Sequence, residues 1–220
     1  MDAWTTHDLF LNEHLIKEDD ALINAFNARI ADDLPEIEVS PTQGKLLYLL
    51  AKIKNAKRIL EIGTFCAYST IWLAKALPDK SGIVITIESS KRLVDIAQKN
   101  IAFANMSNKI NIKYGEATDI INEMISNKTE PFDMIFIDAD KPRYSIYLNL
   151  VQQLSKPGTI ICTDNIIING ELCNMENTKP KASGLRKFIK NLGNKDSIES
   201  TAIQTVGKKG YDGFTISVVK

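Results

Sequence analysis

Apolar and polar positions follow two different patterns along the chain. In the first part, apolar residues such as Leu22 and Phe26 recur at helical spacing. This spacing predicts two helical stretches within the first 34 residues. A third helix is expected from Ser40, an N-cap, and Pro41, a first helical position, to about Lys54.

From Arg58 onward, short apolar runs alternate with helical patterns. We expect strands at 58–62, 83–87, 110–114, 132–137 and 158–163, and helices at 69–77, 91–105, 117–127 and 143–154. Such alternation predicts right-handed crossovers and a parallel sheet with helices on both faces.

The last part of the chain breaks this alternation. Residues 200–206 and 214–219 are strand-like, and the turn-rich segment GKKGYDG joins them, which predicts a hairpin closing one edge of the sheet. Residues 164–184 are polar and irregular, and we expect them to form a loop over the binding site that is described below. The predicted fold class is therefore α/β, in a single domain of residues 1–220 with N-terminal helices at 1–55 and an α/β core at 56–220.

Composition narrows the classes of function. Lys+Arg and Asp+Glu are both 27, and this formal neutrality argues against a broad nucleic-acid surface. No apolar run approaches the roughly 20 residues that span a bilayer, and the N-terminus lacks a secretion signal. Cys66, Cys162 and Cys173 form no C-x-x-C pair, so reduced thiols in a cytoplasmic protein are expected.

The stretch Arg58–Thr70 contains the first candidate for a binding site. Its strand carries Glu61, ends at Gly63 and leads directly into a helix, the layout of a nucleotide-type site. An ordinary strand-to-helix turn has the same pattern. Glu88 ends the next strand, near the position of the ribose-binding acid about 20 residues after the glycines of dinucleotide folds. Because G-x-G-x-x-G is absent, the pattern favours a nucleoside cofactor without a pyrophosphate.

A second set of polar residues follows the next two strands of the predicted core. Asp138 comes after residues 132–137, and Asp164 and Asn165 come after residues 158–163. Because the carboxyl ends of parallel strands line one crevice, these oxygens are expected to converge on Mg²⁺, with Mn²⁺ and Ca²⁺ as alternatives. Strand-terminal aspartates also cap helices and turns, which is the competing interpretation.

One lysine and the two histidines of the chain are further candidates for catalytic or metal-binding roles. Lys141, three positions after Asp138, is either a solvated surface lysine or a base, and spacing alone leaves both open. His7 and His14 lie in the N-terminal helical region and are expected at the surface.

Several motifs together resemble one family. EIGTFCAYS, TIES, GEATD, FIDADK and TDN, with VSPTQG and QTVGKKGYDGF, resemble the metal-dependent class I O-methyltransferases of the caffeoyl-CoA and catechol O-methyltransferase family. The likeness is greatest to small bacterial members that methylate catechols, and it runs from about Val39 to the C-terminus. It implies a three-layer Rossmann-like sandwich with a mostly parallel seven-stranded sheet and an antiparallel last strand.

The resemblance also implies roles for individual residues. S-adenosylmethionine contacts are implied at Val39, Glu61, Gly63, Thr64, Ser69, Glu88, Ala117, Asp138 and Asp140, with Glu88 on the ribose and Ala117 beside the adenine. Metal ligands are implied at Asp138, Asp164 and Asn165, a base at Lys141 that acts together with Asp138, and a substrate contact at Asn169.

Two positions depart from the family pattern. Ala67 replaces a usual glycine, so the loop is expected to sit differently against the methionine moiety. Ile168 replaces a tryptophan common in plant enzymes, so no CoA-ester substrate is inferred.

The leading expectation for function is methyl transfer to a vicinal hydroxyl of a catechol or polyphenol. One alternative is a tRNA hydroxyuridine O-methyltransferase, for which Lys179, Lys181, Arg186, Lys187 and Lys190 would form a local basic patch. Others are a non-catalytic nucleoside-binding module and an NAD-dependent dehydrogenase. The apolar N-terminal helices and the family likeness together predict a homodimer.

Overall fold

The computed structural model describes residues 3–78 and 81–220. Its helices are α1 (Ala3–Leu15), α2 (Asp20–Ala31), α3 (Pro41–Lys54), α4 (Tyr68–Ala76), α5 (Lys91–Phe103), α6 (Ala117–Ser126), α7 (Tyr144–Gln152) and α8 (Pro180–Gly193), with a short 3-10 turn, η1 (Lys141–Arg143). Its strands are β1 (Arg58–Ile62), β2 (Ile83–Glu88), β3 (Ile110–Tyr114), β4 (Phe132–Ile137), β5 (Ser155–Thr163), β6 (Ile198–Gly207) and β7 (Gly210–Val219).

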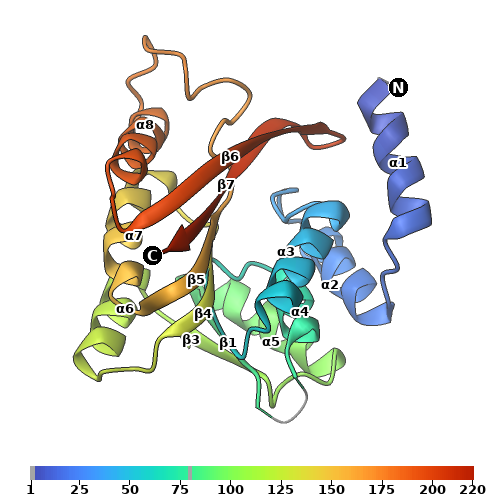
Figure 1. Ribbon diagram of the computed structural model, residues 1–220. Helices are drawn as coiled ribbons and strands as arrows, with labels where there is room; N and C mark the ends of the chain where they lie inside the picture. Colours follow the sequence, from blue (N-terminus) through green and yellow to red (C-terminus); the bar gives the residue numbers. More distant parts are fainter. Residues whose placement is uncertain (1–2, 79–80) are drawn as a thin grey trace.

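The strands form one mixed sheet in the order β3-β2-β1-β4-β5-β7-β6 (Figure 1). Strands β1 to β5 pair in parallel with their neighbours, and β7 runs antiparallel to both β5 and β6. The predicted fold class, including the antiparallel last strand, is confirmed. The first of the core strands, β1, lies in the interior of the sheet between β2 and β4, where both of its edges are paired.

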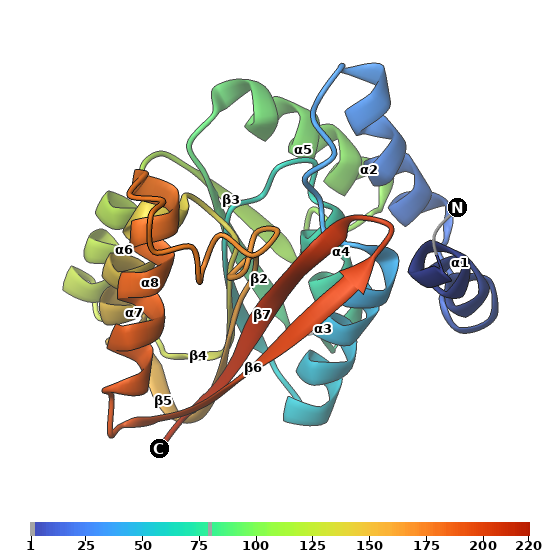
Figure 2. The same cartoon turned by 90° about the horizontal axis from the view of Figure 1, so that it is seen from above.

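Two hydrophobic cores, one on each face, hold the helices to the sheet (Figure 2). Along β4 the side chains alternate between them: Ile135 and Ile137 belong to the core under α6, α7 and α8, while Met134 and Phe136 belong to the core under α2 to α5. This is the period of two that a strand imposes, and it explains why the buried strands are apolar on both sides.

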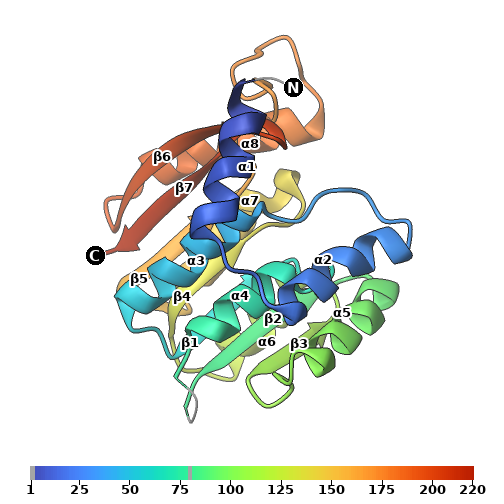
Figure 3. The same cartoon turned by 90° about the vertical axis from the view of Figure 1, so that its right-hand side faces the viewer.

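The N-terminal helices follow the predicted pattern. Ser40 caps α3 by accepting a hydrogen bond from the backbone N–H of Gln43 at 3.3 Å, with Pro41 at the first helical position. Helix α1 differs from the others because none of its side chains is buried, and it packs against β6 (Figure 3). His7 and His14 are exposed on it, as predicted. No helix among residues 3–78 and 81–220 is long and apolar enough to cross a membrane.

Helix α8 was not predicted, and the expectation of an irregular loop over 164–184 is wrong from Pro180 onward. Gly184 lowers the intrinsic helix propensity of this segment. The helix forms because Ala182, Leu185, Phe188 and Leu192 bury one face. Gly184 lets α8 approach η1 closely, since a Cβ there would lie 2.6 Å from Cα of Pro142.

The C-terminal hairpin is confirmed, with a tighter turn than expected. The two strands pair as far as Gly207 and Gly210, so only Lys208 and Lys209 lie in the turn. Strand β5 also begins earlier than predicted, at Ser155.

Candidate functional site

Strand register brings the predicted site residues to one edge of the sheet. Ile62 of β1 pairs with Ile137 of β4, and Ile137 pairs with Thr163 of β5. The next residue of each strand follows the same register: the N–H of Asp138 donates to Ile62 O at 2.9 Å, and the N–H of Asp164 donates to Ile137 O at 3.0 Å. Gly63, Asp138 and Asp164 therefore lie side by side.

Gly63 is at the point of closest approach between β1 and β4. Its φ is +99°, and a Cβ at this position would lie 2.0 Å from the carbonyl oxygen of Asp138. A side chain is excluded both by the backbone conformation and by the space. The glycine thus fixes how near Asp138 lies to the turn between β1 and α4.

Glu61 is fully buried in a cluster of hydroxyl groups. Its carboxylate accepts hydrogen bonds from Ser69 Oγ at 2.7 Å, from Thr86 Oγ1 at 2.6 Å and from Thr70 Oγ1. Burial raises the pKa of Glu61 to about 7, against the opposing effect of these hydroxyls. In this arrangement Glu61 and Ser69 bind each other, and they hold the start of α4 against the end of β1.

Glu88 closes the turn after β1. Its Oε2 accepts hydrogen bonds from the N–H groups of Thr64 at 3.3 Å and Phe65 at 3.0 Å, and its Oε1 accepts one from Ser90 N–H at 2.9 Å. Backbone donors thereby fix the carboxylate at the end of β2, beside the Gly63 turn. Thr64 is buried as well, with its hydroxyl 2.6 Å from that of Thr86.

A charged network lies at the start of α6. Arg143 donates to Asp140 at 2.7 Å and to Glu116 at 2.6 Å, and these hydrogen bonds raise the pKa of the guanidinium. Tyr147 also donates its hydroxyl to Asp140. Ala117 follows Glu116 and is buried against the core under α6. Arg143 and Tyr147, which the sequence reasoning did not include, hold Asp140 in place.

Lys141 is buried, so its interpretation as a surface lysine is wrong. Its side chain is 10% exposed, and its ammonium lies 3.0 Å from Asp138 Oδ1 and 2.9 Å from Asn165 Oδ1. Asn165 turns toward it in a left-handed conformation, with φ +51°. The ammonium therefore bridges two of the three predicted metal ligands.

Asp164, the third predicted ligand, is almost fully buried. Burial and the nearby charge of Asp138 raise its pKa to about 7, while a hydrogen bond with Gln43 and one from the Asn165 N–H oppose the shift. The hydroxyl of Tyr144 donates to the backbone oxygen of Asp164 at 3.0 Å. Gln43 and Tyr144 were missed as site residues, although Gln43 stands three positions after the N-cap in the VSPTQG motif.

These side chains fit a divalent cation. The carboxylate of Asp138 and the amide oxygen of Asn165 meet at the Lys141 ammonium, and the charges of Asp138 and Lys141 act on the Asp164 carboxylate, so the site already accommodates one positive charge. Within the described residues no group of three or more His, Cys, Asp and Glu side chains suited to a metal was found. Mg²⁺ is nonetheless commonly held by one or two carboxylates, with water and substrate completing its shell.

Asn169 and its loop are attached to the hairpin. The N–H of Asn169 donates to Tyr211 O at 2.8 Å, and its Oδ1 accepts from Tyr211 N–H at 3.3 Å. Asp212 Oδ1 accepts from the N–H groups of Ile167 and Ile168, each at 3.0 Å. Ile168, which replaces the tryptophan of the plant enzymes, thus lies in a loop whose backbone N–H groups are bound by Asp212 of β7.

Val39, a predicted cofactor contact, and Cys66, a predicted reduced thiol, are both buried. Val39 is buried in the core under α2 to α5, just before α3. Cys66 is buried in the turn before α4, and burial raises the pKa of its thiol to about 12, which suits a packing role. Ala67 adopts φ +65° where the family usually has glycine.

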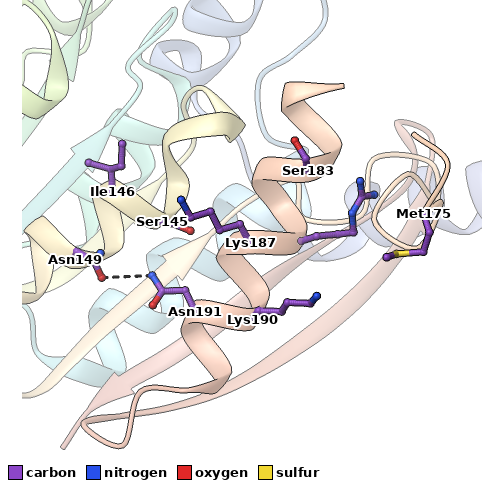
Figure 4. Close-up of a pocket in the computed structure, with 9 residues that line it drawn as sticks. Ser145, Ile146, Asn149, Met175, Ser183, Lys187, Lys190 and Asn191 are labelled. Atoms are coloured by element: carbon purple, nitrogen blue, oxygen red, sulfur yellow. Dashed lines mark hydrogen bonds between the residues drawn. The ribbon is translucent and has the colours of Figure 1, made fainter. Parts of the chain in front are cut away.

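A cavity of about 630 Å³ opens between α7 and α8 and contains none of the predicted cofactor, metal or substrate residues, but members of the predicted basic patch line it (Figure 4). Ser145 and Asn149 line it from α7, and Lys187 and Lys190 line it from α8. Asn191 donates across it to Asn149 at 3.4 Å. Arg186 also lines this cavity, but it donates to backbone oxygens of the loop before α8.

Comparison with known proteins gives a consistent result. The model of the O-methyltransferase family matches residues 12–217. A catechol O-methyltransferase of Niastella koreensis is 44% identical over 213 residues, covering 97% of this chain and 96% of that protein. The crystal structure of the O-methyltransferase from Bacillus cereus in complex with SAH has a TM-score of 0.95 and 43% identity, covering 99% of this chain and 98% of that chain. The O-methyltransferase TomG from Streptomyces achromogenes, in complex with SAM, has a TM-score of 0.96 and 40% identity over the whole of both chains.

Proposed function

The chain belongs to the O-methyltransferase family and is an S-adenosylmethionine-dependent O-methyltransferase, and from this premise we propose that it methylates a vicinal hydroxyl of a catechol-like small molecule with the help of a divalent cation. The observation that carries the proposal is the convergence of Asp138, Asp164 and Asn165 beside the buried Lys141. Family membership decides against the nucleoside-binding module and the NAD-dependent dehydrogenase.

In this proposal Asp138, Asp164 and Asn165 hold the cation, with Mg²⁺ as the expected ion. When bound, it would supply Lewis-acid and templating chemistry to an acceptor with two adjacent hydroxyls. The buried position of Asp164 supports this role, because a buried carboxylate is stabilised in its charged form by a nearby positive charge. Gln43 and Tyr144 would position Asp164 through its side chain and its backbone oxygen.

Lys141, once it has released a proton to solvent and is a neutral amine, would accept the proton of the hydroxyl that is methylated and become an ammonium again. Its ammonium lies between two ligand oxygens, so the side chain reaches the place where the acceptor hydroxyls would sit. The acceptor oxygen then forms a bond to the methyl carbon, and the carbon–sulfur bond of the cofactor breaks to give S-adenosylhomocysteine. Holding both reactants in line could lower the barrier by roughly 7–11 kcal/mol in well-oriented cases.

The cofactor would occupy the edge formed by the Gly63 turn, Glu88 and Ala117. Glu88 would accept hydrogen bonds from the ribose hydroxyls, since its carboxylate is fixed by three backbone donors. Glu61 would act through Ser69 and the turn rather than by direct contact, because its oxygens are buried in hydroxyl hydrogen bonds. Asp140, held by Arg143, would border the adenine side together with Ala117.

Incubation with labelled S-adenosylmethionine, Mg²⁺ and a panel of catechols tests the proposal. We expect label in the catechol ether and loss of transfer when a chelator removes the cation. Full activity in the presence of chelator would contradict the metal role. Absence of label in every catechol would contradict the acceptor class.

A tRNA acceptor is the second candidate, and one observation favours it. Lys187 and Lys190, two members of the predicted basic patch, both line the cavity of Figure 4 from α8, although their side chains point in different directions. Undermodified tRNA added to the same labelled reaction distinguishes the two acceptors. The neutral overall charge keeps the small molecule as the leading proposal.

We also propose that the protein is a cytoplasmic homodimer. Its three cysteines are unpaired, which agrees with a reducing compartment. The residues Phe10 and Leu15 on α1 are 61% and 65% exposed, and a second copy of the chain would cover them. Sedimentation that showed only a 24.5 kDa species at micromolar concentration would contradict the dimer.

A further inference from the structure

The turn between β1 and α4 has a backbone conformation that is unusual for its residues. Phe65 and Ala67 both have left-handed backbones, with φ of +52° and +65°, although neither is a glycine. Such conformations are uncommon for residues with a side chain, and they persist where the surrounding structure fixes them. Ala67 is also the N-cap of α4, and no side chain caps this end of the helix. The groups that fix the turn therefore come from other elements.

Strand β2 and helix α5 supply these groups. Glu88, at the end of β2, accepts a hydrogen bond from the N–H of Phe65 at 3.0 Å. Asn100, on α5, is 4% exposed and donates from its Nδ2 to the backbone oxygen of Cys66 at 2.9 Å. Glu88 thus binds a donor of the turn, and Asn100 binds the acceptor that lies between the two left-handed residues.

A second asparagine accounts for the orientation of the Asn100 amide. A backbone oxygen can only accept, so Asn100 turns its Nδ2 toward Cys66 and its Oδ1 away. This Oδ1 accepts a hydrogen bond from Nδ2 of Asn24 at 3.0 Å. Asn24 belongs to α2, which packs against both α4 and α5 (Figure 3). Two side-chain hydrogen bonds therefore connect the N-terminal region to the turn after β1.

We propose that Asn100 is a positioning residue for the cofactor: through Cys66 it keeps the turn in the conformation that receives S-adenosylmethionine, and Asn24 holds its amide in the required orientation. This inference rests on the cofactor placement given in the proposed function, beside Gly63 and Glu88. A turn that lacks the Asn100 contact would populate other conformations, and the cofactor would bind only the competent fraction of molecules. The Kd then rises as that fraction falls, whereas enzyme saturated with cofactor keeps the parent rate.

The first variant is Asn100→Leu, which has nearly the same size and no donor. Calorimetry should show the Kd of S-adenosylmethionine rising by about tenfold, with a similar rise in its KM. The kcat with catechol and Mg²⁺ at saturating cofactor, and the KM of catechol, should stay at the parent values. Ile101→Ala is the matched control, because Ile101 is the next residue of α5 and is buried in the core under α2 to α5. It should lower the midpoint of urea unfolding and leave the Kd unchanged.

Two variants of Asn24 test the orientation of the amide. Asn24→Asp places an acceptor opposite Oδ1, so the Asn100 amide should reverse and lose Cys66, and the Kd of S-adenosylmethionine should rise severalfold. Asn24→Ala leaves the bond between Asn100 and Cys66 in place and should remain within about twofold of the parent. Asn24 is only partly buried, so these variants keep the inference testable if Asn100→Leu does not fold.

The outcomes separate positioning from a purely structural role. Asn100→Leu with lower stability but the parent Kd, or with a lower kcat and the parent Kd, would overturn the inference. Equal Kd values for Asn24→Asp and Asn24→Ala would overturn the orienting role of Asn24. Glu88→Ala with the parent Kd would overturn the cofactor placement, and this inference with it. A parent enzyme that binds S-adenosylmethionine but methylates no catechol would overturn only the acceptor class, since calorimetry needs no acceptor.

Discussion

The replacement Gly63→Ala tests how the site is assembled. An L-residue at φ +99° costs about 1–2 kcal/mol relative to an ordinary conformation. The added methyl group would also lie 2.0 Å from Asp138 O and 2.9 Å from its carbonyl carbon. Overpacking of this kind typically costs about 1–3 kcal/mol. The expected loss of unfolding free energy is therefore about 2–5 kcal/mol, out of a total of about 5–15 kcal/mol for a typical domain.

Substitutions at two other glycines separate the cost of the backbone conformation from the cost of the steric overlap. Gly170 also has a positive φ, +87°, but no atom lies within 4 Å of an added Cβ, so Gly170→Ala should cost only the conformational part, about 1–2 kcal/mol. Gly193 ends α8 with open space around it, and Gly193→Ala should be neutral or stabilising by up to about 1 kcal/mol.

Urea unfolding followed by fluorescence of the buried Trp72, with calorimetry of S-adenosylmethionine binding, measures these effects. We expect Gly63→Ala to lose cofactor affinity as well as stability, because β1 and β4 must separate at the site. The reasoning is refuted if Gly63→Ala is no less stable than Gly170→Ala and binds the cofactor as the parent does.

Further outcomes concern the polar residues of the site. Asp164→Ala should bind S-adenosylmethionine almost as the parent does yet lose Mg²⁺-dependent turnover. Glu88→Ala should weaken S-adenosylmethionine binding and leave the metal site in place. Calorimetry and turnover assays would show whether cofactor binding and metal binding can be lost independently. Lys141→Ala should slow transfer by about 10²–10⁴-fold near neutral pH and recover in part at high pH, and turnover at the parent rate would contradict its role as base. Because the pKa of Glu61 rises from 4.5 unfolded to about 7 folded, its ionisation should make the protein less stable as pH increases across that window, by up to about 3 kcal/mol. Glu61→Gln should flatten this dependence in pH-resolved urea unfolding, and an unchanged slope would contradict the assignment.

The sequence predicted the part of the site that strand register controls. Asp138 and Asp164 follow apolar strands, and parallel pairing leaves them little freedom to be anywhere except side by side. Sequence spacing could not place Lys141 in the interior, because four residues after the end of a strand the chain can turn either way. Its burial follows from η1, which α8 covers through the close contact at Gly184.

The missed residues come from elements far away in the sequence. Gln43 reaches Asp164 from α3, and Lys209 of the hairpin turn donates to the backbone oxygen of Glu38 just before α3. No local pattern encodes these approaches, since they depend on how whole helices and strands pack. Helix α8 was missed for a different reason: Gly184 weakens the local helix propensity, and burial of Phe188 and Leu192 outweighs this effect.

The position of β7 between β5 and β6 has a consequence for the order of events during synthesis. In the described part of the chain β6 pairs with β7 alone, so β6 leaves the ribosome before its partner exists. Strands β1 to β5 can pair as they are made, whereas the outer hairpin must wait for β7 and then attach to β5 as a unit. The turn of that hairpin carries Lys209 and contacts Asp8, about 200 residues away. The side of the site next to this turn therefore forms after the part that β1 to β5 build. A nascent chain halted before β7 should therefore expose the free edge of β5 to other chains.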